Sequence, residues 1–289
     1  MKHIVLLLGV FLGGLTSLIA QKSDSGRLLS VGEASLYYEV SGKGQPVVFI
    51  HGFTLDRRMW EPQWQVLQRR YRVVRYDVRG FGRSSRATEP HDPAEDLAAL
   101  LDHLNIERAH VVGLSMGANI ALHFATRYPQ RVLRVVAADP NLDGFTDYTP
   151  ELFGAFGQVF GAVAQKGWSE ETQRLWLQTP LLRLQIPTVA HQTLLEDMVR
   201  AYSGDQFINP AIAALNYGQP PTAARIDKLE VPVLVIVGEK DEESIQRIAR
   251  LVAQKAPRAQ LEVVPKAGHL SNLDHPKYFN RAVLRFLKK

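Results

Sequence analysis

Short strand-like runs alternate with helical patterns along most of the chain, and this alternation constrains the fold more than any other feature. The strand-like runs lie at residues 33–40, 47–50, 72–76, 110–113, 132–138, 233–237 and 261–264. Most of them are continuously apolar, which is typical of strands buried on both faces. Helical patterns lie at residues 93–104, 116–128, 243–256 and 276–287. Such alternation through short loops predicts an α/β fold with a mostly parallel, doubly wound sheet.

One interval departs from this alternation. Residues 141–226 contain no convincing buried strand, and their helical patterns are rich in Leu, Phe and Trp and broken by prolines. A structureless loop of this length would be improbable inside a compact domain. We therefore predict a core formed by residues 21–140 and 227–289, with a helical lid inserted at residues 141–226.

The first twenty residues predict an export signal. Lys2 precedes an apolar run at residues 4–19, and Ala20 is followed by a polar stretch. A charged start, an apolar middle and a small residue at the end form the layout of a cleaved signal peptide. An uncleaved membrane anchor is the alternative, because the run is at the short limit for spanning a bilayer. We expect a periplasmic or secreted protein with no stable membrane partner after cleavage.

Composition excludes several functional classes. The chain is 46% hydrophobic and 22% charged, which is the balance of a globular protein rather than a disordered one. Its net charge is +5, but Lys and Arg are spread along the sequence, so we expect no nucleic-acid partner. The chain has no cysteine, which excludes a thiol nucleophile and thiolate metal sites. The histidines lack zinc-binding spacing, and we expect neither a metal ion nor a cofactor.

A serine lies between two glycines where a predicted strand gives way to a predicted helix. The stretch reads Gly113-Leu114-Ser115-Met116-Gly117. Glycine has no Cβ, so backbone can pack closely around a tight turn that exposes the serine hydroxyl. The positive end of the helix then faces charge that develops at the serine. This pattern predicts a nucleophile elbow, and a helix start capped by the serine is the alternative.

A serine nucleophile needs a base to take its proton and an acid to orient that base. Asp241 and His269 each follow a predicted strand, as Ser115 does. Open α/β sheets place their sites at the carboxyl ends of parallel strands, so we expect these three residues to meet. Four other carboxylates compete for the role of the acid: Asp139, Glu239, Glu242 and Glu243.

Two backbone N–H groups are candidates for binding an oxyanion. The segment His51-Gly52-Phe53 comes directly after the strand predicted at residues 47–50. A loop that leaves a strand there can aim an N–H at the oxygen that becomes negative during acyl transfer. We expect Phe53 to supply one donor and Met116 the other, and we expect His51 to have a structural role.

Taken together, these segments resemble the α/β-hydrolase fold superfamily, in its lidded group of esterases, enol-lactonases, carbon–carbon bond hydrolases and haloperoxidase-like enzymes. The matching pieces are residues 51–53, 77–84, 113–117, 238–241 and 268–269, and the resemblance extends over about residues 35–287. The order Ser…Asp…His is the one expected of this superfamily. The resemblance implies Ser115, Asp241 and His269 as a catalytic triad and Phe53 and Met116 as oxyanion donors.

The expected activity is hydrolysis of a small ester, thioester or lactone through an acyl-enzyme on Ser115. The aromatic and leucine content of residues 141–226 favours a small-molecule substrate with an apolar acyl or alkyl part. Carbon–carbon bond hydrolysis or perhydrolysis by the same triad, and ligand binding with low turnover, remain alternatives. Arg183 and His191 are candidates for contact with a polar substrate group, although we expect both at the surface.

Overall fold

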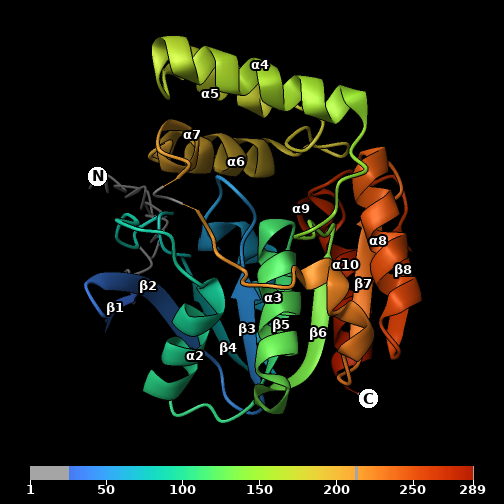
Figure 1. Ribbon diagram of the computed structural model, residues 1–289. Coiled ribbons are helices and arrows are strands. Elements are labelled where there is room, and N and C mark those ends of the chain that lie inside the picture. The colour runs from blue at the N-terminus through green and yellow to red at the C-terminus, as the bar shows by residue number, and fades with distance from the viewer. Residues whose placement is uncertain (1–25, 212–213, 289) are drawn as a thin grey trace, which may run out of the picture.

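A single mixed sheet organises the molecule. This computed structural model describes residues 26–211 and 214–288, and within them eight strands pair in the order β1-β2-β4-β3-β5-β6-β7-β8 (Figure 1). They are β1 (Arg27–Val31), β2 (Ala34–Ser41), β3 (Pro46–Ile50), β4 (Arg72–Tyr76), β5 (Ala109–Leu114), β6 (Val132–Ala138), β7 (Val233–Gly238) and β8 (Ala259–Val264). β2 pairs antiparallel with β1 and β4, whereas all pairs from β4 to β8 are parallel. The predicted, mostly parallel α/β sheet is confirmed.

Helices cover both faces of the sheet. Those of the core are α1 (Glu61–Leu67), α2 (Pro93–His103), α3 (Met116–Arg127), α8 (Glu243–Lys255), α9 (Ser271–Asp274) and α10 (Pro276–Leu287). Figure 1 shows α2 and α3 in front of the sheet and α10 behind it, where α10 contacts α1. Every residue of β5 and β7 is buried between these layers, which explains why both strands are continuously apolar.

The two edges of the sheet differ from what the sequence predicts. β1 is not predicted, because three of its five residues are exposed and its sequence forms no continuous apolar run. It joins β2 through a tight turn in which Gly32 has a φ of 59°, as the first turn position of a type II′ hairpin requires. Among the described strands β8 pairs with β7 alone, at the edge of the sheet, and Leu261 and Val263 are 41% and 46% exposed rather than buried.

Among the described residues, four α-helices and two short 3-10 helices lie between β6 and β7, in the interval where the sequence predicts an insertion. The α-helices are α4 (Pro150–Lys166), α5 (Glu170–Leu177), α6 (Val189–Ala201) and α7 (Asp205–Ile208), and Figure 1 shows them across the carboxyl ends of the strands. Within the described part of this interval the β-pairing is limited to one isolated bridge, between Leu215 and His91. The domain bounds at residues 141 and 226, and the role of these helices as a lid, stay predictions.

The predicted signal segment, residues 1–20, lies outside the described residues, and export stays a prediction. Among the residues that the structure does describe, no helix has both the length and the apolar character needed to cross a bilayer.

We expect truncation of a side chain to lower the free energy of unfolding far more at the centre of the sheet than at its edge. Ile236 in β7 is fully buried, so Ile236→Ala should lower the free energy of unfolding by about 2–5 kcal/mol. Leu261→Ala in β8 removes a half-exposed side chain and should change it by about 0.5 kcal/mol or less. Urea-induced unfolding of both variants measures the difference, and equal losses would contradict the edge position of β8.

Candidate active site

Ser115 lies at a strained turn between β5 and α3. Its backbone has φ 54° and ψ −113°, a conformation that costs a non-glycine residue about 1–3 kcal/mol. A Cβ on Gly113 would lie 2.0 Å from the carbonyl oxygen of Gly117, and a Cβ on Gly117 would lie 2.2 Å from that of Ile50. The flanking glycines are therefore required by contacts between backbones. The Ser115 side chain caps no N–H of α3, so the capping alternative does not hold.

His269 is oriented by Asp241. The two residues follow β8 and β7, and His269 Nδ1 lies 3.0 Å and 3.1 Å from the two carboxylate oxygens of Asp241. A Cβ on Gly238 would lie 2.2 Å from the carbonyl oxygen of Gly268, so the loops that carry the pair pack backbone to backbone. Both residues are buried. When Nδ1 donates its proton to the carboxylate, Nε2 is left as the acceptor.

The competing carboxylates have other partners. Asp139 is fully buried and accepts hydrogen bonds from the Gly238 N–H, at 2.8 Å, and from the Ser271 hydroxyl, at 2.5 Å. Burial, and then the charge of Asp241, raise the pKa of Asp139 well above its usual range. Glu239 accepts from the Lys266 N–H, Glu242 caps α8, and Glu243 pairs with Arg247. Of the five candidate acids, Asp241 is the one that hydrogen-bonds to His269 among the described residues.

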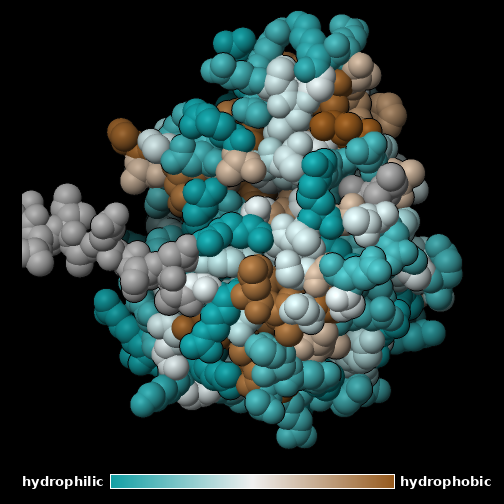
Figure 2. Space-filling view, turned by 90° about the vertical axis from the view of Figure 1, so that its left-hand side faces the viewer, coloured by the Kyte–Doolittle hydropathy of each residue, from teal (hydrophilic) through white to brown (hydrophobic). Residues whose placement is uncertain are grey.

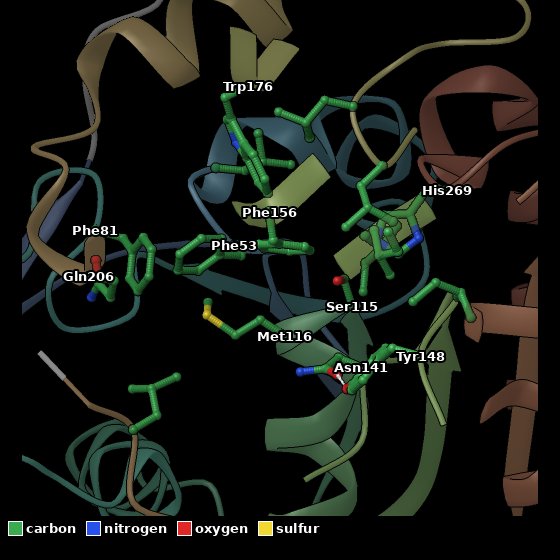
Figure 3. Close-up of a pocket in the computed structure, with 18 of the residues that line it drawn as sticks. Phe53, Phe81, Ser115, Met116, Asn141, Tyr148, Phe156, Trp176, Gln206 and His269 are labelled. Atoms are coloured by element: carbon green, nitrogen blue, oxygen red, sulfur yellow. Dashed lines mark hydrogen bonds between the residues drawn. The ribbon is translucent and has the colours of Figure 1, made fainter. Parts of the chain in front are cut away.

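The two predicted oxyanion donors border the same cavity as Ser115. Phe53 and Met116 both line it, and Figure 3 shows them near Ser115. Within the described residues neither N–H donates to another protein group, and the Met116 N–H belongs to the first turn of α3, which has no intrahelical acceptor. The next residue, Thr54, has a φ of 61° and accepts a 2.7 Å hydrogen bond from the Trp176 indole, which fixes this loop against α5.

His51 is a structural residue, as expected. Its Nδ1 lies 2.8 Å from the Gly52 carbonyl oxygen, and its Nε2 accepts from the Val78 N–H at 2.9 Å. Complete burial lowers the pKa of His51 to about 4. A neutral ring, protonated on Nδ1, satisfies both contacts, so His51 joins the loop after β3 to the loop after β4.

A largely apolar cavity of about 580 Å³ connects Ser115, His269 and the insertion helices (Figure 3). Its aromatic wall consists of Phe53, Phe81, Phe153, Phe156, Phe160 and Trp176, and its polar groups come from Ser115, Asn141, Tyr148, Gln206, Tyr217 and His269. The sequence does not predict Asn141, Tyr148, Gln206 or Tyr217 as site residues. Only Asn141 carries a usable signal, because it follows a buried strand as the other site residues do. Arg183 and His191 do not line the cavity.

The cavity reaches the surface beside α4. Phe153 and Phe160 line it and are also 76% and 43% exposed. Figure 2 shows hydrophobic side chains among the helices at the top of the molecule, above a surface that is mostly hydrophilic. The described residues contain no group of His, Cys, Asp and Glu that could hold a metal ion.

The glycines of the elbow should tolerate no side chain. Gly117→Ala brings a Cβ against the carbonyl oxygens of Ile50 and His51, at 2.2 Å and 2.7 Å, and should lower the free energy of unfolding by about 2 kcal/mol or more. Gly157→Ala in α4 is the matched control. A Cβ there meets nothing within 4 Å, so this variant should gain about 0.5–1 kcal/mol. Chemical denaturation compares them, and similar changes in both would contradict the close packing.

His51 should make the protein less stable in mild acid. An unfolded chain protonates this ring near pH 6.5 and the folded chain near pH 4, so the folded state binds fewer protons between these values. The free energy of unfolding should therefore decrease by about 3 kcal/mol as the pH falls through this window. NMR titration of the His51 ring nitrogens measures the effect directly, and a midpoint near 6.5 would contradict it. In His51→Asn this part of the pH dependence should disappear.

Comparison with known proteins places the chain in a family. The α/β hydrolase fold family matches residues 45–276. RutD of Caulobacter sp. (strain K31), provisionally named as a carbamate hydrolase, is 32% identical over 266 residues, which cover 87% of this chain and 95% of RutD. 3-Oxoadipate enol-lactonase 1 of Acinetobacter baylyi is 26% identical, over 84% of this chain and 88% of the lactonase. The structure of a thermophilic esterase from Thermogutta terrifontis superposes with a TM-score of 0.73 at 27% identity, over 91% and 98% of the two chains. The chain is therefore a member of the α/β-hydrolase fold family and an enzyme of the hydrolase class.

Proposed function

We propose that this enzyme hydrolyses a small carboxylic ester, thioester or lactone through an acyl-enzyme on Ser115. The observation that carries the proposal is the convergence, in one apolar cavity, of a serine on a strained elbow with a histidine bonded to a buried aspartate. Ser115, Asp241 and His269 follow one another along the chain in this order and lie at strand ends, as in a serine hydrolase of this fold.

The first half-reaction transfers the acyl group to the enzyme. His269 Nε2 takes the proton of the Ser115 hydroxyl while Oγ attacks the substrate carbonyl. Asp241 stabilises the resulting imidazolium through Nδ1. The carbonyl oxygen becomes negative and accepts hydrogen bonds from the Phe53 and Met116 N–H groups, each worth about 3–4 kcal/mol in sites of this type. As the tetrahedral intermediate collapses, Nε2–H protonates the leaving group.

The second half-reaction returns the enzyme to its starting state. A water molecule gives a proton to His269 Nε2 and attacks the acyl carbon of the ester on Ser115. The same two N–H groups bind the new oxyanion, and Ser115 Oγ leaves with the proton that Nε2 returns. This step yields the free Ser115 hydroxyl and a carboxylic acid. The two half-reactions together consume one water and need no cofactor.

The cavity supports a substrate with an apolar acyl or alkyl part. Apolar side chains form most of its wall, including aromatic ones from the core and from α4 and α5, and they favour a group that gains free energy by leaving water. Two of the similar proteins, an enol-lactonase and an esterase, are named for the lactone and ester bonds that this proposal includes.

Hydrolysis of p-nitrophenyl esters from acetate to decanoate tests the proposal. We expect turnover by the full-length enzyme, with a chain-length optimum set by the cavity. Ser115→Ala and His269→Ala should each lower kcat by roughly 10⁶-fold, and Asp241→Asn by about 10⁴-fold, because the imidazole loses its orienting anion.

Ser30→Ala is the matched control for the serine, because Ser30 lies on the exposed strand β1 and its loss should leave kcat unchanged. Turnover that survives in a folded Ser115→Ala variant would overturn the acyl-enzyme. A folded wild type that hydrolyses no ester would overturn the esterase proposal and point to carbon–carbon bond hydrolysis, perhydrolysis or ligand binding by the same cavity.

A further inference from the structure

Asn141 and Tyr148 form a polar corner in the largely apolar cavity. Both residues line it together with Ser115, whereas Leu152, Phe156 and Leu270 are among the apolar residues of the same wall. The Tyr148 hydroxyl donates a 3.0 Å hydrogen bond to Asn141 Oδ1. Neither side chain takes part in the acyl transfer proposed above, so the corner calls for another role.

The hydrogen bond from Tyr148 fixes the orientation of the Asn141 amide. Because Oδ1 accepts from the hydroxyl, the NH2 group is turned to the other side, and Figure 3 shows the amide nitrogen away from Tyr148 and below Met116. Across residues 26–211 and 214–288, this NH2 donates to no protein group. Burial raises the pKa of the Tyr148 hydroxyl, which therefore stays protonated and continues to donate.

The loop that carries the corner is held at several points. The Asn141 N–H donates to the Ser115 carbonyl oxygen at 3.2 Å, which ties this residue directly to the elbow. Further along, the Asp143 N–H donates to Asn119 Oδ1 and the Thr149 N–H donates to Ser244 Oγ, at 3.0 Å and 2.8 Å. A donor held in this way needs little further ordering when it binds a ligand, so more of its hydrogen bond contributes to affinity.

We infer that the Asn141 amide is a specificity determinant that selects substrates with a hydrogen-bond acceptor next to the scissile carbonyl, such as a 2-alkoxy, 2-hydroxy or 2-oxo group. This inference rests on the proposed function and adds a substrate class to it. A substrate with only carbon at that position covers the NH2 group without satisfying it, and an unsatisfied donor in an apolar site costs more than a donor in water.

A pair of matched esters tests the inference. p-Nitrophenyl butanoate and p-nitrophenyl methoxyacetate have the same chain length and differ by one CH2 replaced with oxygen, two bonds from the carbonyl carbon. The measured quantity is the ratio of kcat/KM for methoxyacetate to kcat/KM for butanoate. The methoxy ester is intrinsically more reactive, but this difference cancels when the ratio in a variant is divided by the ratio in the wild type.

Asn141→Leu keeps the shape of the side chain and removes the donor. We expect the ratio to fall by about 3- to 10-fold, the size of one neutral hydrogen bond. Tyr148→Phe frees the amide to rotate and should lower the ratio in the same direction by a smaller factor. Phe156→Leu is the matched control: it reshapes the apolar wall and changes both rates, but it should leave the ratio as in the wild type.

The outcomes separate this inference from the proposed function. Ester turnover that depends on Ser115, with equal ratios in wild type and Asn141→Leu, overturns the inference and leaves the proposed function intact. If neither ester shows turnover that depends on Ser115, the proposed function fails and the inference fails with it. Should Asn141→Leu not fold, Asn141→Asp keeps an acceptor for Tyr148 and removes the donor, so an unchanged ratio in that variant is equally decisive.

Discussion

Contact between backbones at three glycines is the constraint on which the rest of the site depends. At Gly113 and Gly117 the elbow packs against itself and against β3, and at Gly238 the loop of Asp241 packs against the loop of His269. In each place a single Cβ would lie about 2 Å from a carbonyl oxygen. These contacts bring the ends of β3, β5, β7 and β8 close enough for their side chains to meet. Ser115 keeps its strained backbone conformation because the surrounding backbone contacts allow no other conformation there.

The same loops supply hydrogen-bond donors to a second buried carboxylate of the site, Asp139. Asp139 and Asp241 are both buried, and burial, followed by the charge of Asp241, raises the pKa of Asp139 well above its usual range. Asp139 is satisfied by the Gly238 N–H and by Ser271, the first residue of α9. It therefore links the two loops that hold Asp241 and His269. Asp241 contacts His269 and Asp139 does not, and this difference follows from the hydrogen-bond donors around each carboxylate rather than from their order in the sequence.

The sequence predicts the central sheet and the elbow because both rest on local patterns. A strand buried on both faces has to be apolar throughout, and the turn at Ser115 needs glycines at fixed positions, so both features can be recognised in the sequence. The edge strands β1 and β8 have a weaker sequence pattern, since an edge strand tolerates exposed residues of any type. The choice of Asp241 over four other carboxylates, and the pairing of Asn141 with Tyr148, depend on where loops meet in space, and no spacing along the chain encodes that meeting.

The glycines of the insertion show how differently the two parts of the cavity are constrained. Gly154, Gly157 and Gly161 lie in α4, and a Cβ on any of them would meet nothing within 4 Å. Each lowers the stability of the helix by about 0.5–1 kcal/mol relative to alanine, and no close contact requires it. The sheet ends thus fix Ser115, Asp241 and His269 through close backbone contacts that leave no room for a Cβ, whereas α4 covers the same cavity with a helix whose glycines can be replaced. The residues at the sheet ends can therefore stay fixed while the wall of the cavity varies, and proteins similar to this chain carry different names, among them an enol-lactonase, an esterase and a chloroperoxidase.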